Sequence, residues 1–438
     1  MRCSSSEIAS DRFFRLFGEL FVIVVTLAVA GCDVPAQIVW SPDGSRAAYR
    51  SGENAVLLDQ KGTILQPLGA SIGGFVWSDD SKSLYFASND EDRNTPTSLN
   101  LQWLGPTGGS ATPPSTESAE PKTVTAVSVL INGKTTPLFR LADVILWDLQ
   151  LSPDGQWIAA MTSVDKQDDN SQEFRLFAYS IHGGGLYELS RFCGLGHCFD
   201  GPSELVFIEA SGLDAVGQLS GHIVKVKLDK SSPELVRRPL LDVLLPLTKW
   251  IEPCKGGFIF TAAPRAFPAP STPDLPRQPY KLFNYSCADG GLAVLADDVG
   301  ELFDASPDGK RILFEKLTAA EVPAARPTTA ESLSRPAPAR DELCVMNANG
   351  SDPHVLRSLD EYIGDPSPPM WPAWRGNDQI TFIATAENAR SVKVDDHDRK
   401  VVDVIQYRLT EKGALEAMHS LSADWKPEIK PYYHADKQ

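Results

Sequence analysis

The sequence predicts an all-β protein made of repeated small sheets, and three observations support this fold class. First, a Ser-Pro-Asp-Gly turn occurs three times, at Ser41–Gly44, Ser152–Gly155 and Ser306–Gly309. Second, a short apolar segment follows each turn, and its branched and aromatic side chains alternate with the period of two that is typical of strands. Third, two degenerate copies, at Trp77–Ser81 and Trp374–Asp378, precede similar segments, so the chain is internally repetitive.

The residues of the turn explain why it joins two strands. The Ser41 side chain accepts backbone N–H groups, Pro42 fixes φ near about −65°, and Gly44 adopts the positive φ that lets the next strand depart. A helix start is excluded, because the residues that follow lack a period of 3.6. Each copy is therefore expected to be a tight hairpin.

These motifs resemble the TolB-type β-propeller repeats, which are relatives of the Trp-Asp repeat family. The resemblance implies a single ring of four-stranded antiparallel blades, stabilised by the packing of each blade against its neighbours. The spacing of the copies predicts seven blades, with six or eight as alternatives and unrelated hairpins in a β-sandwich as a different fold. The predicted blades cover about residues 37–70, 73–141, 145–192, 203–242, 247–297, 300–358 and 370–421.

The propeller as a whole is predicted to span residues 38–421, with a C-terminal tail at 422–438. The last blade supplies all four of its strands, so the sequence identifies no swapped strand that would close the ring.

The N-terminus is predicted to be an export signal with a lipid attachment site. Basic residues precede an apolar run, Leu20–Ala30, which is too short to span a bilayer but suits a signal peptide. The run leads into Val-Ala-Gly-Cys at 29–32, which resembles the bacterial lipobox, whose Cys is acylated and becomes the new terminus. This implies a signal peptide at 1–31, a lipid anchor at Cys32 and a linker at 32–37. The alternative is a buried helix that ends in a Cys.

The composition is that of a folded soluble protein, with 42% hydrophobic and 22% charged residues. The 57 acidic residues outnumber the 41 basic ones and give a net charge of −16. This charge argues against a sequence-independent nucleic-acid binder, because phosphate binding needs the opposite sign. We expect a monomer without a cofactor, tethered by lipid to a membrane of the bacterial cell envelope, with the propeller outside the cytoplasm. Whether this is the inner or the outer membrane is left open.

Outside the cytosol, cysteine thiols tend to pair. Cys193 and Cys198 are predicted to lie in the connection between the third and fourth blades and to form a small disulfide loop. A zinc site with the intervening His197 is rejected, because the sequence lacks a second ligand pair at suitable spacing. Cys254 and Cys287 are a second candidate pair in one blade, although the strand between them would hold their Cα atoms about 10 Å apart.

Two further motifs are weighed and rejected. Gly69–Gly73 matches the nucleophile elbow of hydrolases, but the opening strand of a blade follows it instead of a helix. Asp90, Asp92 and Asn94 alternate as in a calcium loop, but the Gly and Glu positions of that loop hold other residues. Cys344 is expected to be a buried strand residue. The sequence therefore assigns no catalytic residue and no metal site.

Four carboxylates are candidates for a site in the central channel. Asp148, Glu252, Glu301 and Asp304 lie near the positions that precede the turns in three blades, and these inner strands line the channel. Converging carboxylates attract a cation or a basic peptide, in line with the negative charge of the chain. Strand alternation allows any one of them to point into the packing between blades instead.

Low-complexity and polar stretches interrupt the predicted blades. They occupy residues 106–123, 163–172, 264–279, 319–339 and 387–400. The last four lie between the second and third strands of their blades, which places them on the face opposite the Ser-Pro-Asp-Gly turns. We expect long mobile loops on that face and a smooth turn face. Such loops either gate or form a binding surface or are insertions that this position tolerates.

The TolB resemblance implies protein–protein interaction at the cell envelope, but its motifs mark hairpins and transfer no binding residue. We predict a non-catalytic, lipid-anchored interaction or scaffold module with an unidentified envelope protein partner. The alternative is a propeller enzyme or ligand-binding protein that acts on a sugar or peptide in the channel, and a third option is a remnant that mainly tethers. Convergent carboxylate, His and Arg groups in the channel would favour the enzyme, whereas an apolar or loop-covered patch would favour the binder.

Overall fold

The chain is almost entirely β-structure in the computed structural model, as the sequence predicts. The structure describes residues 36–434 except for those at 53, 71–72, 90–100, 104–123, 143, 166–171, 184, 192, 214–218, 230–236, 245–247, 255, 263–279, 319–339, 360–369 and 395–396. The helical elements among the described residues are two short 3₁₀ turns, η2 (Ala386–Asn388) and η3 (Pro427–Ile429). No helix in this part of the chain is long and apolar enough to cross a membrane.

Four-stranded antiparallel sheets are the repeated unit of the fold. The first contains β1 (Gln37–Trp40), β2 (Arg46–Ser51), β3 (Asn54–Asp59) and β4 (Ile64–Ala70). The second contains β5 (Phe75–Trp77), β6 (Ser83–Asn89), β8 (Val124–Ile131) and β9 (Lys134–Ala142). The third contains β10 (Ile145–Leu151), β11 (Trp157–Asp165), β12 (Gln172–Ser180) and β13 (Leu186–Ser190). The fourth contains β14 (Cys193–Phe199), β15 (Glu204–Leu213), β16 (Leu219–Lys227) and β17 (Arg237–Leu244).

Two strands break the simple repeat. β7 (Leu101–Trp103) lies between β6 and β8 in sequence but pairs in parallel with β13 at the outer edge of the third sheet. β21 (Leu292–Ala305) is shared, because it pairs with β20 through its first half and with β22 through its second. It thereby joins a seven-stranded sheet of β18 (Thr248–Cys254), β19 (Gly257–Ala262), β20 (Tyr280–Ser286), β21, β22 (Arg311–Thr318), β23 (Arg340–Asn347) and β24 (His354–Ser358).

The last repeat carries an additional small sheet. Its own four strands are β25 (Ala373–Arg375), β26 (Gln379–Ile383), β29 (Val404–Leu409) and β30 (Leu415–Ser420). The small sheet combines a hairpin inserted after β26 with a strand from the C-terminal tail, and its members are β27 (Arg390–Val394), β28 (His397–Val401) and β31 (Tyr432–His434).

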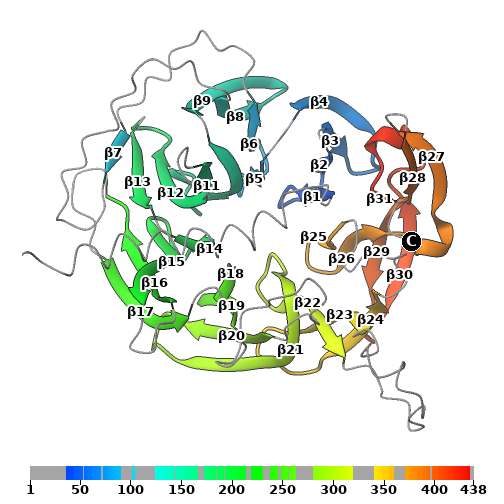
Figure 1. Cartoon of the computed structure of the whole chain (residues 1–438). Helices are drawn as coiled ribbons and strands as arrows, with labels where there is room; N and C mark the ends of the chain where they lie inside the picture. The colour runs from blue at the N-terminus through cyan, green and yellow to red at the C-terminus, as the bar shows by residue number, and fades with distance from the viewer. Residues whose placement is uncertain are drawn as a thin grey trace, which may run out of the picture.

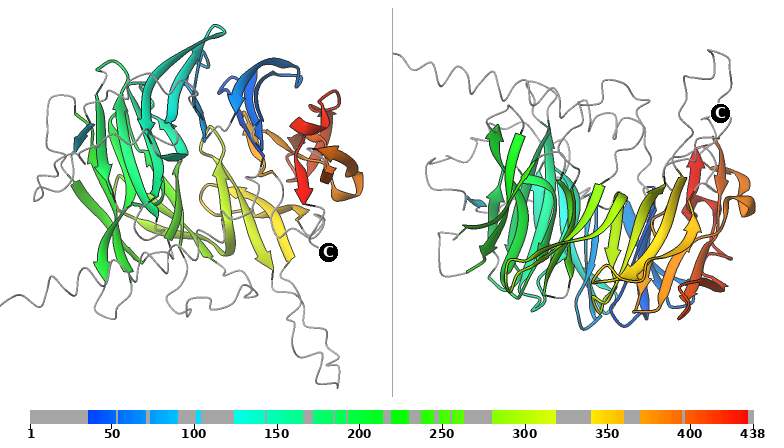
Figure 2. Two further views of the ribbon diagram at one scale, coloured as in Figure 1. Left: turned by 45° about the horizontal axis from the view of Figure 1, so that its top comes forward. Right: turned by 90° about the horizontal axis from the view of Figure 1, so that it is seen from below.

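The sheets are arranged in a ring, which is the arrangement of a β-propeller (Figure 1). The strands nearest the centre, here called the inner strands, are β1, β5, β10, β14, β18, the second half of β21, and β25. Each inner strand contacts the next in this order, and β25 contacts β1, so the cycle is closed. The side views in Figure 2 show the strands running between the two faces of the ring.

One predicted boundary is wrong. The fourth sheet begins with β14 at Cys193, about ten residues before the predicted start at 203. The segment taken for a connection is therefore an inner strand. Its turn, Asp200–Ser203, performs the role of the Ser-Pro-Asp-Gly turn, because the Asp200 amide donates to the carbonyl of Glu204 at 2.9 Å.

The recurrent turns have the geometry that their residues predict. In the third copy the Ser306 hydroxyl donates to Asp308 Oδ1 at 2.8 Å and accepts the Arg311 amide at 3.0 Å, while Gly309 has φ +64°. The degenerate copy keeps this backbone, since Ser81 adopts φ +61° at the glycine position. The turn is thus specified by hydrogen bonds within a few residues.

Tryptophans at the leading position of the turn motif bind each sheet to the preceding one. The Trp77 indole Nε1 donates to the carbonyl of Val39 in β1 at 3.0 Å. The Trp374 indole donates to the carbonyl of Asp304 in β21 at 3.3 Å. Each bond connects two inner strands, so the motif contributes both a hairpin and a link between sheets.

The apolar core is divided among the interfaces between consecutive sheets. Trp157 and Phe207 belong to one buried cluster between the third and fourth sheets, and Ile208 and Phe258 belong to another between the fourth sheet and β18–β20. Because the two faces of one strand supply different clusters, a single sheet buries little without its neighbours.

The ring closes through side-chain contacts between the first and last sheets. The Trp40 indole donates to Thr381 Oγ1 in β26 at 2.7 Å. The Arg375 guanidinium lies 4.2 Å from the Trp40 ring centroid and donates to the carbonyl of Gly44 at 3.1 Å. The first and last sheets each keep their own four strands, so no exchanged strand takes part in this closure among the described residues.

The C-terminal tail reinforces this seam, a role that the sequence did not reveal. The Trp425 ring packs 4.7 Å from that of Tyr49, and its indole donates to the carbonyl of Gly62 at 2.7 Å. Gly62 has φ +86°, and a Cβ there would lie 2.0 Å from the carbonyl oxygen of Leu421. Residues 422–434 therefore belong to the packed structure rather than to a separate tail.

The predicted loop face is tested in only one place. The stretches at 106–123, 264–279 and 319–339 and most of 163–172 lie outside the described residues. The charged stretch 387–400 is not one long loop, because β27 and β28 form a hairpin there that pairs with β31. The division into a smooth face and a looped face stays a prediction.

The seam predicts a large cost for removing Trp425. Trp425→Ala deletes a buried ring and the bond to Gly62, so we expect the free energy of unfolding to fall by about 3–5 kcal/mol. Urea denaturation measures this change. The control is Met418→Ala, whose side chain in β30 is 41% exposed and should alter stability by less than about 0.5 kcal/mol. Equal losses in the two variants would contradict the assigned role of the tail.

Candidate functional site

A cavity of about 410 Å³ lies between the ends of two neighbouring inner strands, β18 and β21. Both strands end in tight turns at this point, and the side chains at their ends line the cavity. The lining residues are Glu252, Pro253, Cys254 and Asp304–Gly309. The cavity is therefore on the side of the ring that carries the Ser-Pro-Asp-Gly turns.

Three of the four predicted channel carboxylates are brought together. Asp148 lies on β10, Glu252 on β18 and Asp304 on β21, so three different inner strands contribute. Asp304 and Asp148 lie close enough to Glu252 for their charges to act on it, and Glu252 and Asp304 line the cavity together. Glu301 also lies in β21, but its side chain is outside the described set.

Burial strongly disfavours the charged forms of the two cavity carboxylates. It raises the pKa of Asp304 to about 7, against the smaller opposing effect of a hydrogen bond from the Ala305 backbone. Burial also raises the pKa of Glu252 well above its usual value, with further contributions from the charges of Asp304 and Asp148. No Lys, Arg or His among the described residues forms an ion pair with either group. A buried carboxylate without a counter-charge is a feature of functional sites.

His197 is the residue of this region whose role the sequence did not indicate. It lies on β14 with its side chain 1% exposed, and its Nδ1 is 3.7 Å from Asp148 Oδ2. Neither ring nitrogen makes a hydrogen bond within the described structure. Burial lowers the pKa of His197, while Asp148 and the Ala159 carbonyl favour its protonated form.

One titratable side chain thus lies on each of four consecutive inner strands. The order around the ring is Asp148, His197, Glu252 and Asp304. The signal that could have revealed His197 is the turn after it, since Asp200–Ser203 marks the preceding residues as an inner strand. The Cys-Gly-Leu-Gly-His-Cys segment favoured a disulfide loop instead.

The predicted disulfide between Cys193 and Cys198 is wrong. Both are free thiols on β14, where they face opposite sides. Cys193 packs in the cluster between the third and fourth sheets, whereas Cys198 packs in the next one, towards β18. A single strand that presents two side chains to opposite interfaces cannot bridge them.

The second predicted pair is also not formed. Cys254 and Cys287 are free, because β19 lies between them: Cys254 pairs with Gly257, which pairs with Ser286. The Cys254 Sγ donates instead to Asn284 Oδ1 at 3.5 Å. Cys344 on β23 is buried, as the sequence predicts.

These thiols do not constitute a metal centre. No group of three or more His, Cys, Asp or Glu in the described part of the chain is arranged to hold a metal ion. Burial, followed by the charge of Asp200, raises the pKa of Cys254 to about 11. A thiol that keeps its proton at neutral pH is a poor nucleophile and a poor ligand.

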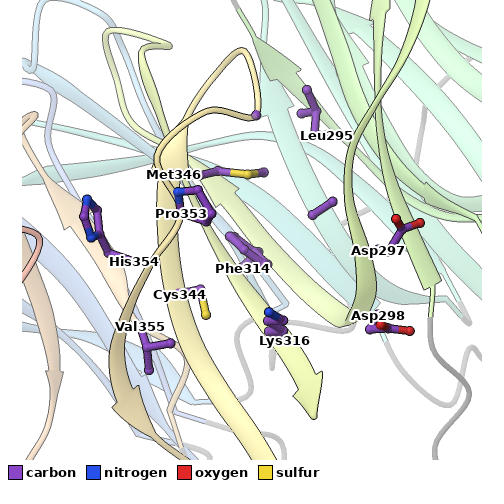
Figure 3. Close-up of a pocket in the computed structure, with 12 residues that line it drawn as sticks. Leu295, Asp297, Asp298, Phe314, Lys316, Cys344, Met346, Pro353, His354 and Val355 are labelled. Atoms are coloured by element: carbon purple, nitrogen blue, oxygen red, sulfur yellow. The ribbon is translucent and has the colours of Figure 1, made fainter. Parts of the chain in front are cut away.

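A second cavity, of about 380 Å³, lies towards the outside of the ring between the first half of β21 and strands β22–β24 (Figure 3). Phe314, Cys344 and Met346 are buried side chains that contribute to its lining. Val294 and Val355 are exposed apolar side chains of the same strands, at 53% and 54%. This groove is the apolar patch among the described surfaces.

The charged groups that line this outer groove are of both signs, namely Asp297, Asp298, Lys316 and His354, and two of them form ion pairs. Asp297 pairs with Lys281 at 2.7 Å, and His354 pairs with Asp352 at 3.1 Å. The cavity between β18 and β21 differs, because Glu252 and Asp304 remain uncompensated. We therefore take the inner cavity as the candidate functional site.

The inner cavity suits the binding of a positively charged group. Two carboxylates supply hydrogen-bond acceptors. No cation among the described residues is paired with them, so their negative potential can attract a positively charged ligand. Paired carboxylates with raised pKa values are also suited to general acid–base chemistry. The geometry therefore allows two functions, cation binding and proton transfer.

Comparisons with known proteins show no family. No protein-family model matches the sequence, and no curated protein matches it. Solved structures that resemble the chain include an oligogalacturonate lyase in complex with manganese, at 12% identity and a TM-score of 0.49, covering 80% of this chain and 85% of that one. The structure of a TolB-like protein from Agrobacterium tumefaciens has 14% sequence identity and a TM-score of 0.36, and the match covers 66% of this chain and 84% of that one. A 6-phosphogluconolactonase-like protein from Bacteroides uniformis has 13% sequence identity and a TM-score of 0.41, and the match covers 89% of this chain and 96% of that one.

At these identities and TM-scores none of the neighbours supplies a function for this chain. The assignment of a function rests on the residues of the site.

The buried carboxyl of Asp304 predicts a pH-dependent stability. In the unfolded chain this group ionises near pH 3.8, but in the folded chain it holds its proton up to about pH 7. Ionisation therefore penalises the folded state, and the penalty grows between these two values as the pH rises. Asp304→Asn removes the penalty, so we expect its Tm to exceed that of the wild type by about 2 °C or more near pH 8.

Near pH 4 the difference should shrink to about 1 °C, because the wild-type carboxyl is then neutral in the folded state and only about half ionised in the unfolded state. Calorimetry at both pH values measures the difference. The matched control is Asp424→Asn, at an exposed position next to the seam, which should not show the same dependence on pH. A lower Tm for Asp304→Asn near pH 8 would contradict the interpretation.

Proposed function

We propose that the protein is a lipid-anchored binding module of the bacterial cell envelope that captures a partner protein at the turn face of its ring. The single observation that carries the proposal is the inner cavity, with Glu252 and Asp304 half-buried in its wall and no counter-charge among the described residues. A carboxyl group whose ionisation is disfavoured on folding and that has no counter-charge costs stability, and such groups are typical of binding sites. The net charge of −16 argues against nucleic acid as the partner.

The proposed module is a propeller of seven blades. The closed cycle of inner strands has the order β1, β5, β10, β14, β18, β21 and β25, which supports one blade for each. In this assignment β21 serves as the outer strand of the fifth blade and the inner strand of the sixth. A monomer is sufficient for the function, because all parts of the cavity come from one chain.

The proposed anchor is Cys32, which lies outside the described residues. Its support is the Val-Ala-Gly-Cys sequence at 29–32 after a short apolar run. An acylated Cys would hold the ring near the membrane, since each buried methylene contributes about 0.8 kcal/mol and two or more chains give stable attachment.

A competing function is catalysis on a sugar or peptide in the channel. The observation that favours it is the pair Glu252 and Asp304, since Asp304 has its pKa raised to about 7, near the operating pH of a general acid. No Arg lines the cavity among the described residues, and the outer groove offers the apolar patch expected of a binder. Turnover of oligosaccharides or peptides that Glu252→Gln abolishes would favour the enzyme.

The anchor predicts acyl labelling of one cysteine. When the protein is expressed with its own N-terminus in bacteria fed a clickable fatty acid, we expect the label to be incorporated and to be lost in Cys32→Ser. Cys3→Ser is the matched control, because Cys3 lies in the segment that the signal peptidase would remove. Gel fluorescence with intact mass measures both. Undiminished labelling of the Cys32→Ser variant would contradict the anchor.

The capture of a partner is tested by site-specific crosslinking in the bacterium that produces the protein. A photoreactive amino acid at Lys310, an exposed position in the turn beside the cavity, is expected to yield one defined crosslinked protein. The same probe at exposed Glu387, in η2 at the opposite end of the second strand of its blade, is the control and should not yield it. The same products from both positions, or no product from Lys310, would overturn the assignment of the turn face.

A further inference from the structure

We propose that the cavity between β18 and β21 binds a single protonated lysine or arginine side chain presented by the partner protein. This inference rests on the proposed binding function and specifies the chemistry of the ligand. It is carried by the geometry of four neighbouring inner strands and by the lining of the cavity.

The charge of the cavity is the first argument. Glu252 comes from the end of one strand and Asp304 from the end of the next, so both face the same space. Asp308, at the rim, is already paired with Lys310 at 3.2 Å. The two deeper carboxyl groups have no such partner in the described structure, and a cation that enters favours the ionised form of each.

His197 is the second and independent argument. Its imidazole is buried behind the cavity lining, its Nδ1 lies 3.7 Å from Asp148 Oδ2, and neither nitrogen makes a hydrogen bond of normal geometry in the described structure, although the Ala159 carbonyl lies close enough to favour the protonated form. Asp148 in turn acts electrostatically on Glu252. Buried polar atoms in native proteins normally have partners, so an orphaned imidazole behind a carboxylate cluster indicates a polar site that is completed by a ligand or its water.

The shape of the cavity fits one long side chain. A volume of about 410 Å³ is at the lower end of the range of about 300–1,000 Å³ for small-ligand sites. Pro253, Ala305 and Pro307 line it with apolar atoms, next to the two carboxylates. Lys and Arg combine an aliphatic stem with a cationic head, and they bury the stem along apolar surface while the head makes charge-assisted hydrogen bonds.

An organic cation fits better than a metal ion. Calcium and magnesium require about six or more oxygen ligands that converge on one point. The described residues contain no group of three potential ligands arranged in that way. An ammonium or guanidinium group has several donors that spread over separate acceptors, so two carboxylates on different strands are sufficient.

Calorimetric titration of the purified propeller with short peptides tests the inference. The probes are acetyl-Gly-Lys-Gly-amide, its arginine counterpart and its norleucine counterpart, with Ca²⁺ and Mn²⁺ titrated separately. We expect saturable binding of the lysine or arginine peptide and none of the uncharged one. Glu252→Gln and Asp304→Asn should each weaken binding by about tenfold or more, whereas Asp424→Asn should not change it.

The affinity should also depend on pH and salt. Binding is expected to strengthen from about pH 6 to about pH 8, because protons compete with the cation for the carboxylates, and to weaken with added salt. The titratable groups that face this region are Asp148, His197, Glu252, Cys254, Asp304 and Asp308. Equal binding of the norleucine peptide, unchanged binding by the two carboxylate variants, no binding of either basic peptide, or binding of a divalent metal alone would each overturn the proposal.

The crosslinking at Lys310 separates this inference from the proposed function. If the Glu252→Gln/Asp304→Asn double variant still captures the same protein with wild-type yield, the basic side chain is refuted while capture at the turn face stands. If the wild type captures nothing there, the proposed function itself fails. A circular dichroism melt of the double variant establishes that it is folded in either case.

Discussion

The fold depends on the contacts between consecutive sheets, and at three junctions of the ring an indole N–H group bonds one sheet to the preceding one. Trp77 and Trp374 each donate to a backbone carbonyl of the sheet before them, and Trp40 makes the corresponding bond across the seam to Thr381. Sheets that bury little alone become a ring because their inner edges are held in register. The candidate site inherits its geometry from this ring: Asp304, whose carbonyl accepts the Trp374 indole, meets Glu252 only when neighbouring sheets are correctly placed.

Closure of the ring is achieved without exchanging a strand. The last sheet is complete, and the tail crosses to the first sheet, where Trp425 packs beside Tyr49 and bonds to Gly62. Lys430, 2% exposed, bonds to Asp403 at 2.6 Å and holds the tail to the last sheet. The seam thus resists opening through buried aromatic surface and a few charge-assisted bonds, rather than through a backbone ladder.

Local patterns were predictable from the sequence and tertiary ones were not. The hairpin turns follow from hydrogen bonds within a few residues, so Ser306 and Asp308 could be interpreted correctly, and the inner-strand positions of Asp148, Glu252 and Asp304 followed from those turns. The start of the fourth sheet was missed because its turn, Asp200–Ser203, lacks the Ser-Pro-Asp-Gly order. The burial of His197 beside Asp148 and the packing of Trp425 against the first sheet both depend on contacts between residues far apart in the sequence. No local sequence pattern predicts either of them.

The shared strand β21 has a mechanical consequence. Its first half lines the outer groove of about 380 Å³, and its last residues line the inner cavity of about 410 Å³. One continuous strand therefore extends from the outer edge of the ring to the inner strands around its centre. Its pairing register with β22 shifts between Val299 and Phe303. We therefore expect the strand to bend at this segment if its outer half moves relative to its inner half.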